Sequence, residues 1–283
     1  MLFSPLIILG ALALILIISG LLEFKYHQQV LLTIPCRIHI NGTRGKSSVT
    51  RLIAAGLRAG GKRTFAKTTG TAPRVIDAQG IDRIIHRLRK PSIGEQVRLL
   101  KYFSDENPDV VVMECMAVQP QYQWISEHQM VKSDIGVITN ARPDHLDEMG
   151  PTEEDVAKSL CNSIPTNGTL ITAQEKHKSI LQSVANSNKS DIVFSDESTI
   201  TMDELNKFKY IEHPQNIAIA LDVCDKMGIN RDIALKGMHS VQPDLGALIV
   251  WKLKVDGGYI QFVIGMAAND PVSTLQIWKF VID

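Results

Sequence analysis

Eight consecutive residues near the N-terminal third of the sequence have the composition of a phosphate-binding loop: Asn41, Gly42, Thr43, Arg44, Gly45, Lys46, Ser47 and Ser48. The glycines would let backbone N–H groups approach phosphate oxygens, Lys46 could reach a β- or γ-phosphate, and Ser47 could bind Mg²⁺. The usual spacing G-x-x-x-x-G-K-[ST] requires glycine where Ile40 stands. Taken alone, this stretch is therefore equally consistent with an ordinary glycine turn at a helix start.

Three other polar groups follow apolar segments further along the chain. Thr69 lies in "KTTGTAPR", whose hydroxyls suit a metal or a phosphate, although a plain β-turn is the simpler interpretation of these residues in isolation. Glu114 ends the apolar run "DVVVME", where a carboxylate needs a partner or a cation. The run "NARPDHLDEMG" contains Asp144, His145 and Asp147. A lone histidine is usually a surface or core residue, but one flanked by carboxylates is a fair metal or phosphate ligand.

Alternating apolar and amphipathic segments determine where these groups would lie. The pattern predicts strands at residues 37–40, 109–114, 134–140, 169–172 and 191–195, and helices at 47–60, 95–107, 152–160 and 213–229. This order favours an α/β fold with a mainly parallel sheet covered by helices on both faces. Ligands collect at the carboxyl ends of such strands, and all four polar groups fall there. Their convergence is the argument for a nucleotide site.

The first 22 residues contain no charged side chain and are nearly long enough to cross a bilayer as a helix. A cleaved signal peptide is the rival interpretation, but no lysine or arginine precedes the apolar run. A buried core helix is a weaker alternative. Lys25 and Arg37 follow the run, so we expect a single-pass anchor in the cell membrane, a short polar linker at residues 23–29, and a catalytic body in the cytoplasm.

Charge and cysteine content exclude other classes of function. The 30 basic and 30 acidic residues balance, and no basic stripe with interleaved aromatic residues is present, which argues against nucleic acid as a partner. The four cysteines form no C-x-x-C pair and lie mostly in apolar runs. They are expected to be reduced, buried thiols and not a disulfide framework or a zinc site.

With these residues assembled, the chain resembles the Mur ligase superfamily of ATP-dependent amide-forming ligases, which includes folylpolyglutamate synthetase. The shortened phosphate loop of that family, G-T-x-G-K-[ST], matches residues 42–47. Within that superfamily, the chain has a nearer resemblance to the ligase subunits of poly-γ-glutamate synthases, the CapB/PgsB type. Segments spanning nearly the whole chain carry this likeness: "NGTRGKSSVTRL", "KTTGTAPR", "IGEQ", "ECMAVQPQYQ", "DHLDEMGPT" and "AANDPVSTLQIWK".

The resemblance implies that ATP activates a glutamate carboxylate as an acyl phosphate, which the amine of the incoming glutamate attacks to extend a poly-γ-glutamate chain for a capsule or secreted polymer. Lys46 would contact the β- and γ-phosphates. Glu114, His145 and Ser47 would hold Mg²⁺, and Thr69 could add a ligand. Lys46, Glu114 and His145 are thus the expected catalytic residues. An integral-membrane subunit that takes the polymer outward is the expected partner.

Two departures from the family accompany this likeness. Many members have a carbamylated lysine on the helix after the histidine loop, but alignment puts Leu160 at that position, and Lys158 would lie on another face of the helix. The second departure is length: the resemblance divides the chain into an anchor and linker (1–34), a central ATP-binding domain (35–240) and the start of a truncated C-terminal α/β domain (241–283).

Two alternatives stay open: a membrane-bound nucleotide-binding module that supports export without ligation, and a folyl- or muramyl-type ligase with another acceptor.

Overall fold

The computed structural model describes residues 5–70, 72–87, 90–243, 249–264, 274–275 and 278. Its strands are β1 (Cys36–Asn41), β2 (Thr64–Thr68), β3 (Arg74–Ile76), β4 (Asp82–Ile84), β5 (Val110–Glu114), β6 (Ile135–Ile138), β7 (Thr169–Thr172), β8 (Asp191–Phe194), β9 (Ile249–Val255) and β10 (Gly258–Ile264). One sheet has the order β4-β3-β2-β5-β1-β6-β7-β8, and β9 and β10 form a separate antiparallel hairpin. Strands β2, β5, β1, β6, β7 and β8 are parallel, whereas β3 and β4 are antiparallel additions at one edge.

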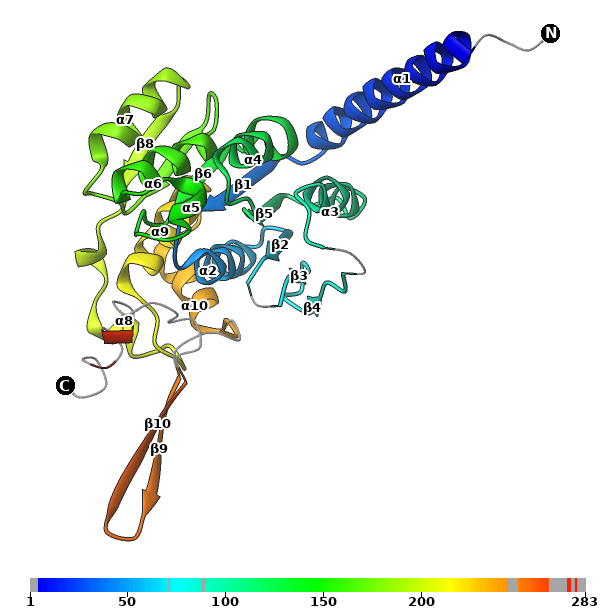
Figure 1. The fold of residues 1–283 in the computed structure, drawn as a ribbon. Helices are drawn as coiled ribbons and strands as arrows, with labels where there is room; N and C mark the ends of the chain where they lie inside the picture. Colours follow the sequence, from blue (N-terminus) through cyan, green and yellow to red (C-terminus); the bar gives the residue numbers. More distant parts are fainter. Residues whose placement is uncertain are drawn as a thin grey trace.

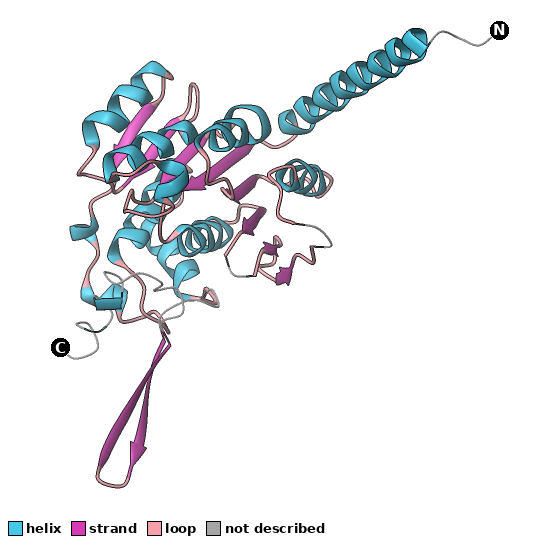
Figure 2. Cartoon of the chain, viewed as in Figure 1, coloured by secondary structure: helices cyan, strands magenta, loops and turns pink. Residues whose placement is uncertain are grey.

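Helices cover both faces of this sheet (Figures 1 and 2). They are α1 (Pro5–Leu32), α2 (Lys46–Ala59), α3 (Glu95–Ser104), α4 (Pro120–Ile125), α5 (Leu146–Met149), α6 (Glu153–Leu160), α7 (Lys178–Ser187), α8 (Met202–Leu205), α9 (Pro214–Lys226) and α10 (Arg231–His239), with a π-helical turn η1 (Ser126–Val131) and short 3₁₀ turns η2 (Cys161–Ser163) and η3 (Glu197–Thr199). The expected mainly parallel α/β architecture is confirmed. The predicted strands correspond to β1, β5, β6, β7 and β8, and the predicted helices to α2, α3, α6 and α9.

The alternation of side chains along the central strand explains the two layers. Successive strand residues point to opposite faces, so Ile38 and Ile40 of β1 join the core that includes α2, α9 and α10. His39 points to the other face, where its Nδ1 lies 2.7 Å from Oε2 of Glu127 in η1. On that face, α6 and α7 pack over one end of the sheet, and α3 with the end of α1 packs over the other.

Helix α1 projects from the body as a long apolar rod (Figure 1). Its most apolar stretch has a mean hydropathy of 2.8 and no buried residue, so the helix is long and apolar enough to cross a membrane. The segment 23–29, expected to be a linker, is instead the continuation of this helix. Nothing in its sequence breaks a helix until Pro35, which disfavours helical geometry in the residue before it, and Val30 and Leu31 anchor the end of α1 in the body.

The β9–β10 hairpin extends away from the sheet at the other end of the molecule (Figure 1). It falls in the region expected to begin a C-terminal domain, but residues 244–248 and most of the "AANDPVSTLQIWK" segment lie outside the described residues. That domain assignment therefore stays a prediction. All four cysteines are free. Cys115, Cys161 and Cys224 are buried, as expected, whereas Cys36 is only partly buried.

Candidate active site

The phosphate-binding loop connects β1 to α2 and depends on two glycines. Gly42 and Gly45 have φ angles of +132° and +82°, which L-residues with a Cβ seldom adopt. A Cβ on Gly42 would overlap the hydroxyl of Thr139, and one on Gly45 would lie 2.8 Å from Oδ1 of Asn216 in α9. The loop backbone is thus pressed against β6 and α9, with no room for a larger residue at either glycine.

Polar residues after β6 fix the shape of this loop. Oδ1 of Asn140 accepts hydrogen bonds from the Thr43 hydroxyl (2.7 Å) and the Arg44 backbone N–H (3.1 Å). Its Nδ2 donates to the Arg44 carbonyl at 3.1 Å, and the Thr139 hydroxyl donates to the same carbonyl at 2.6 Å. Asn140 is only 5% exposed, so a buried amide that makes three hydrogen bonds supports the loop. Such support holds the loop in one conformation before any ligand arrives.

Lys46 begins α2 and lies within the loop that it would serve. Its Nζ donates to the carbonyl of Gly42 at 2.6 Å and to that of Thr43 at 3.3 Å. The ammonium therefore lies against the loop carbonyls, and a change of side-chain rotamer would bring it to a phosphate bound at the loop. Asn41 instead uses its amide to hold the fold, donating to Gln123 at 3.1 Å. Ser48 is half-buried in the first turn of α2.

Three of the residues predicted to bind metal come into direct contact. The carboxylate of Glu114 accepts hydrogen bonds from the Ser47 hydroxyl (2.8 Å), from the Thr69 backbone N–H (2.8 Å) and from the Thr69 hydroxyl. Glu114 ends β5, Thr69 follows β2, and Ser47 lies in the first turn of α2, which the loop connects to β1. Because β2, β5 and β1 are neighbouring parallel strands, the three residues meet at one edge of the sheet. A carboxylate with two hydroxyls is an all-oxygen donor set of the kind that Mg²⁺ prefers.

His145 lies apart from this cluster. It adopts a left-handed conformation (φ +47°) just before α5, its side chain is about half exposed, and its Nε2 lies 4.0 Å from Oδ1 of Asp144. The structure gives it no hydrogen bond to Glu114, Ser47 or Thr69, although His145 and Thr69 line the same cavity. Asp147 is exposed on α5 and does not line the cavity.

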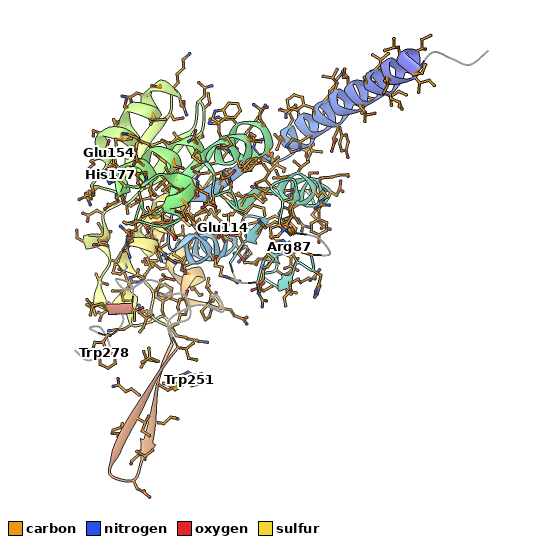
Figure 3. The ribbon with its side chains drawn as sticks, viewed as in Figure 1. Arg87, Glu114, Glu154, His177, Trp251 and Trp278 are labelled. Carbon is orange, nitrogen blue, oxygen red and sulfur yellow. The ribbon has the colours of Figure 1, made fainter. Side chains whose placement is uncertain are left out.

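A cavity of about 350 Å³ joins these parts, within the range of small-molecule sites. The phosphate loop, Thr69 and the residues after β5 form much of its wall, and Asp144 and His145 form another part. Arg87, which follows β4, completes the lining on the β3–β4 side of Glu114 (Figure 3). Among the described residues, no group of three or more His, Cys, Asp or Glu side chains could hold a metal, so a metal here would rely on hydroxyl oxygens.

Helix α6, which follows the segment that contains His145, has no lysine facing the site. Leu160, at the position where the resemblance implies a carbamylated lysine, is fully buried among apolar side chains. Lys158 is exposed and pairs with Glu154 at 2.7 Å. The role of the family lysine is therefore not carried by either residue of α6.

Two buried carboxyl groups lie behind the site. Glu127 pairs with His39 of β1, and Glu212 lies beside Asn216 of α9. Burial alone would lower the pKa of His39, but the charge and hydrogen bonding of Cys115 and Glu127 raise it to about 10. Behind Gly45, burial raises the pKa of Glu212, whose carboxylate accepts a hydrogen bond from Asn216 at 2.7 Å. Neither carboxyl group is assigned a role in binding: Glu127 holds His39 of β1, and Glu212 holds Asn216 of α9.

Sequence reasoning missed three residues that shape this site. Asn140 was within the polar run after β6 and could have been found by the same strand-end rule that identified His145. Asn216 has no local signal, because its contact with the loop comes from α9, far along the chain. Arg87 also lacks one, since it lies in an irregular segment and its partner Glu95 is eight residues away.

Comparison with known proteins identifies the family. The model of the Mur ligase middle domain matches residues 40–251. The chain is 40% identical over its whole length to a protein named capsule biosynthesis protein CapB of Bacillus anthracis, and 39% identical over 94% of its length to one named PGA synthase CapB of Bacillus subtilis (strain 168). It spans 61% and 68% of the lengths of these two relatives.

Solved structures agree with this assignment at the level of the fold. A bifunctional folylpolyglutamate synthase/dihydrofolate synthase with Mn, AMPPNP and L-glutamate bound superposes with a TM-score of 0.66, at 14% identity, over 92% of this chain and 69% of that one. Escherichia coli FolC in complex with ADP superposes with a TM-score of 0.59, at 17% identity, over 78% of this chain and 61% of that one. From its sequence and its fold together, the chain belongs to the Mur ligase family.

Proposed function

We propose that this chain is an ATP-dependent amide ligase that adds glutamate to a growing poly-γ-glutamate chain, for a capsule or secreted polymer. The contact of Ser47 and Thr69 with Glu114, beside Lys46 at the cavity, is the observation that carries the proposal. This contact supports a site for a nucleoside triphosphate with Mg²⁺. The identity to proteins named CapB supports glutamate as the substrate.

In this mechanism the γ-carboxylate of the chain end attacks the γ-phosphorus of ATP, giving an acyl phosphate and ADP. The amine of the incoming glutamate then attacks the acyl carbon, forms the amide bond and releases phosphate. The loop backbone from Asn41 to Ser48 binds the phosphates, and Lys46 moves from its loop carbonyls to the transferred phosphoryl group, whose charge it stabilises. Glu114, Ser47 and Thr69 hold Mg²⁺, which neutralises phosphate charge when bound.

His145 is proposed as a further Mg²⁺ ligand that reaches the site when the nucleotide is bound. It lines the cavity, and its half-exposed position at the start of a short helix leaves it free to turn inward. In the structure it faces Asp144, so this role requires a movement of the segment between β6 and α5.

We further propose that α1 anchors the ligase in the cell membrane with its body in the cytoplasm, next to an integral-membrane subunit that takes the polymer outward. The exposed apolar surface of α1 and its length support the anchor. Attachment at the membrane would place synthesis beside export. The central ATP-binding domain would comprise residues 35–240.

Two alternatives make different products. A membrane-bound nucleotide-binding module would hydrolyse ATP whether or not glutamate is present, and a folyl- or muramyl-type ligase would require another acceptor. Membranes containing the chain and its partner subunits would be incubated with ATP, Mg²⁺ and labelled glutamate. The proposal predicts glutamate-dependent ADP release and a γ-linked product of high mass. ATP turnover that ignores glutamate, with no such product, would refute it.

A further inference from the structure

Arg87 is a cavity-lining cation that the proposed chemistry does not yet use. Both Arg87 and Lys46 line the cavity, but Arg87 follows β4, whereas Lys46 begins α2. Figure 3 shows Arg87 on the β3–β4 side of Glu114. The Arg87 side chain is 20% exposed, so the guanidinium is largely removed from bulk water. A largely buried guanidinium requires a charged or hydrogen-bonding partner, and Glu95 supplies one.

Glu95 at the start of α3 fixes the orientation of Arg87. Nε of Arg87 donates to Oε2 of Glu95 at 2.7 Å, and Nη2 donates to Oε1 at 2.9 Å. Burial alone would raise the pKa of Glu95, but hydrogen bonds from Arg87 and the charge of Lys67 lower it, which keeps the carboxylate ionised. The pair therefore has the two-pronged geometry that holds a guanidinium plane rigidly.

Glu95 also forms an ion pair with a second basic residue, Lys67. Nζ of Lys67, whose side chain is fully buried in β2, lies 3.6 Å from Oε1 of Glu95. Glu95 thus sits between two basic side chains and cannot follow Arg87 outward without leaving Lys67. The wall formed by Lys67, Glu95 and Arg87 is a preorganised structure, which is what a site that recognises a ligand by orientation requires.

The open edge of the guanidinium is available to a ligand. Because the group is planar and uses its Nε and Nη2 edge on Glu95, Nη1 lies on the opposite edge, and within the described part of the chain Nη1 has no hydrogen-bond partner. Planar donors of this kind match carboxylates better than a lysine ammonium does. The predicted ligand is therefore a carboxylate inside the cavity.

The proposed reaction supplies such a carboxylate, and the inference rests on that proposed function. In a γ-linked chain each glutamate reacts through its γ-carboxyl and keeps a free α-carboxylate a few bonds away. When the γ-carboxyl is at the phosphoryl group beside Lys46, the α-carboxylate of the same residue must lie elsewhere in the cavity. We propose that Arg87, positioned by Glu95, binds this α-carboxylate and so selects a chain end whose α-carboxylate is free.

The test compares two primers on the full chain in membranes with its partner subunits, ATP, Mg²⁺ and labelled glutamate. One is a short γ-linked oligoglutamate, and the other is the same oligomer with its terminal α-carboxylate converted to an amide. We expect the wild type to use the free acid with a KM about 10- to 100-fold lower than that of the amide. We expect Arg87→Ala to lose this ratio while the KM for ATP stays unchanged.

Arg87→Gln keeps a shorter, polar side chain without the charge, and it should also lose the ratio if Arg87→Ala fails to fold. Arg83→Ala is the matched control, because Arg83 lies in β4, is exposed, and pairs with Asp77 at 3.2 Å. A purely structural role of Arg87 would slow both primers equally and preserve the ratio, which would overturn the inference alone. A wild type that forms no γ-linked product with either primer would overturn the proposed function and this inference together.

Discussion

Asn140→Ala tests whether the phosphate loop is held from the end of β6, because the hydrogen bonds that this side chain makes within the described part of the chain go to the loop. The amide makes three hydrogen bonds to Thr43 and Arg44, at 2.7, 3.1 and 3.1 Å, and is 5% exposed. At about 1 kcal/mol for each bond, with partial rescue by water at the half-buried Arg44, the loss should be about 2–3 kcal/mol. That free energy appears as a less stable fold, as a loop that opens, or as both.

The consequence for nucleotide binding follows from the fraction of loops that remain ordered. If loop opening absorbs about 2 kcal/mol of the loss, the equilibrium constant for opening rises about 30-fold, and the apparent Kd for nucleotide rises by up to about the same factor, which is reached where the open form predominates. The assay is calorimetric titration of the detergent-solubilised full chain with a non-hydrolysable ATP analogue and Mg²⁺, paired with urea denaturation. Both measurements are made on wild type and variant under the same conditions.

Asn162→Ala is the matched control. Among the described residues, the side chain of Asn162 makes one hydrogen bond, from its Nδ2 to the Ser159 carbonyl at 2.8 Å in the η2 turn, and none to residues 41–48. We expect it to lower the free energy of unfolding by less than about 1 kcal/mol and to leave nucleotide affinity unchanged. Equal nucleotide affinity in Asn140→Ala and wild type would refute the claim that Asn140 preorganises the loop.

Three further substitutions probe the other parts of the site. Lys46→Ala should abolish glutamate-dependent phosphate release, because it removes the ammonium that lies on the loop carbonyls and that would stabilise the transferred phosphoryl group; unchanged turnover in a phosphate assay would refute its assignment. His145→Ala should raise the Mg²⁺ concentration needed for half-maximal activity, and an unaltered Mg²⁺ titration would remove His145 from the metal site. Glu127→Gln should lower the free energy of unfolding by about 3 kcal/mol near neutral pH, because it breaks a fully buried pair with His39. Cys115 and Glu127 together raise the pKa of His39 from 6.5 to about 10, so the stability that depends on its charge is complete below about pH 6.5 and is lost as pH rises toward 10; urea denaturation should therefore show the difference between the two proteins shrinking over that range, and a constant difference would contradict it.

Much of the fold could be predicted because its determinants are local. The apolar run 109–114 and the glycine-rich turn at 41–48 predict β5 and the connection from β1 to α2, and the ordering of strands and helices predicts a parallel sheet. The short antiparallel strands β3 and β4 were not predicted, because three-residue strands carry no readable alternation. The polar segment 23–29 was wrongly expected to be a linker, since a sequence of helix-tolerant polar residues does not show where a helix stops.

For the site, the rule that ligands collect at strand ends brought Ser47, Thr69 and Glu114 together correctly as neighbours. The same rule does not say how far a side chain extends along a loop, and His145 lies beyond contact with that cluster. Arg87 could not be predicted, because its position depends on Glu95 and on the buried Lys67. Contacts between segments that are separate in sequence, and not residue type, decide these placements.

Transfer of oxygen from glutamate to phosphate tests the central claim most directly. The γ-carboxyl oxygens of an oligo-γ-glutamate primer would carry the heavy stable isotope of oxygen, and released phosphate would be examined by mass spectrometry. An acyl-phosphate ligase predicts a single labelled oxygen in phosphate for each amide bond formed, because the carboxylate oxygen that attacks phosphorus leaves with it. Phosphate that carries only solvent oxygen while ATP is consumed would contradict the account and indicate a nucleotide hydrolase.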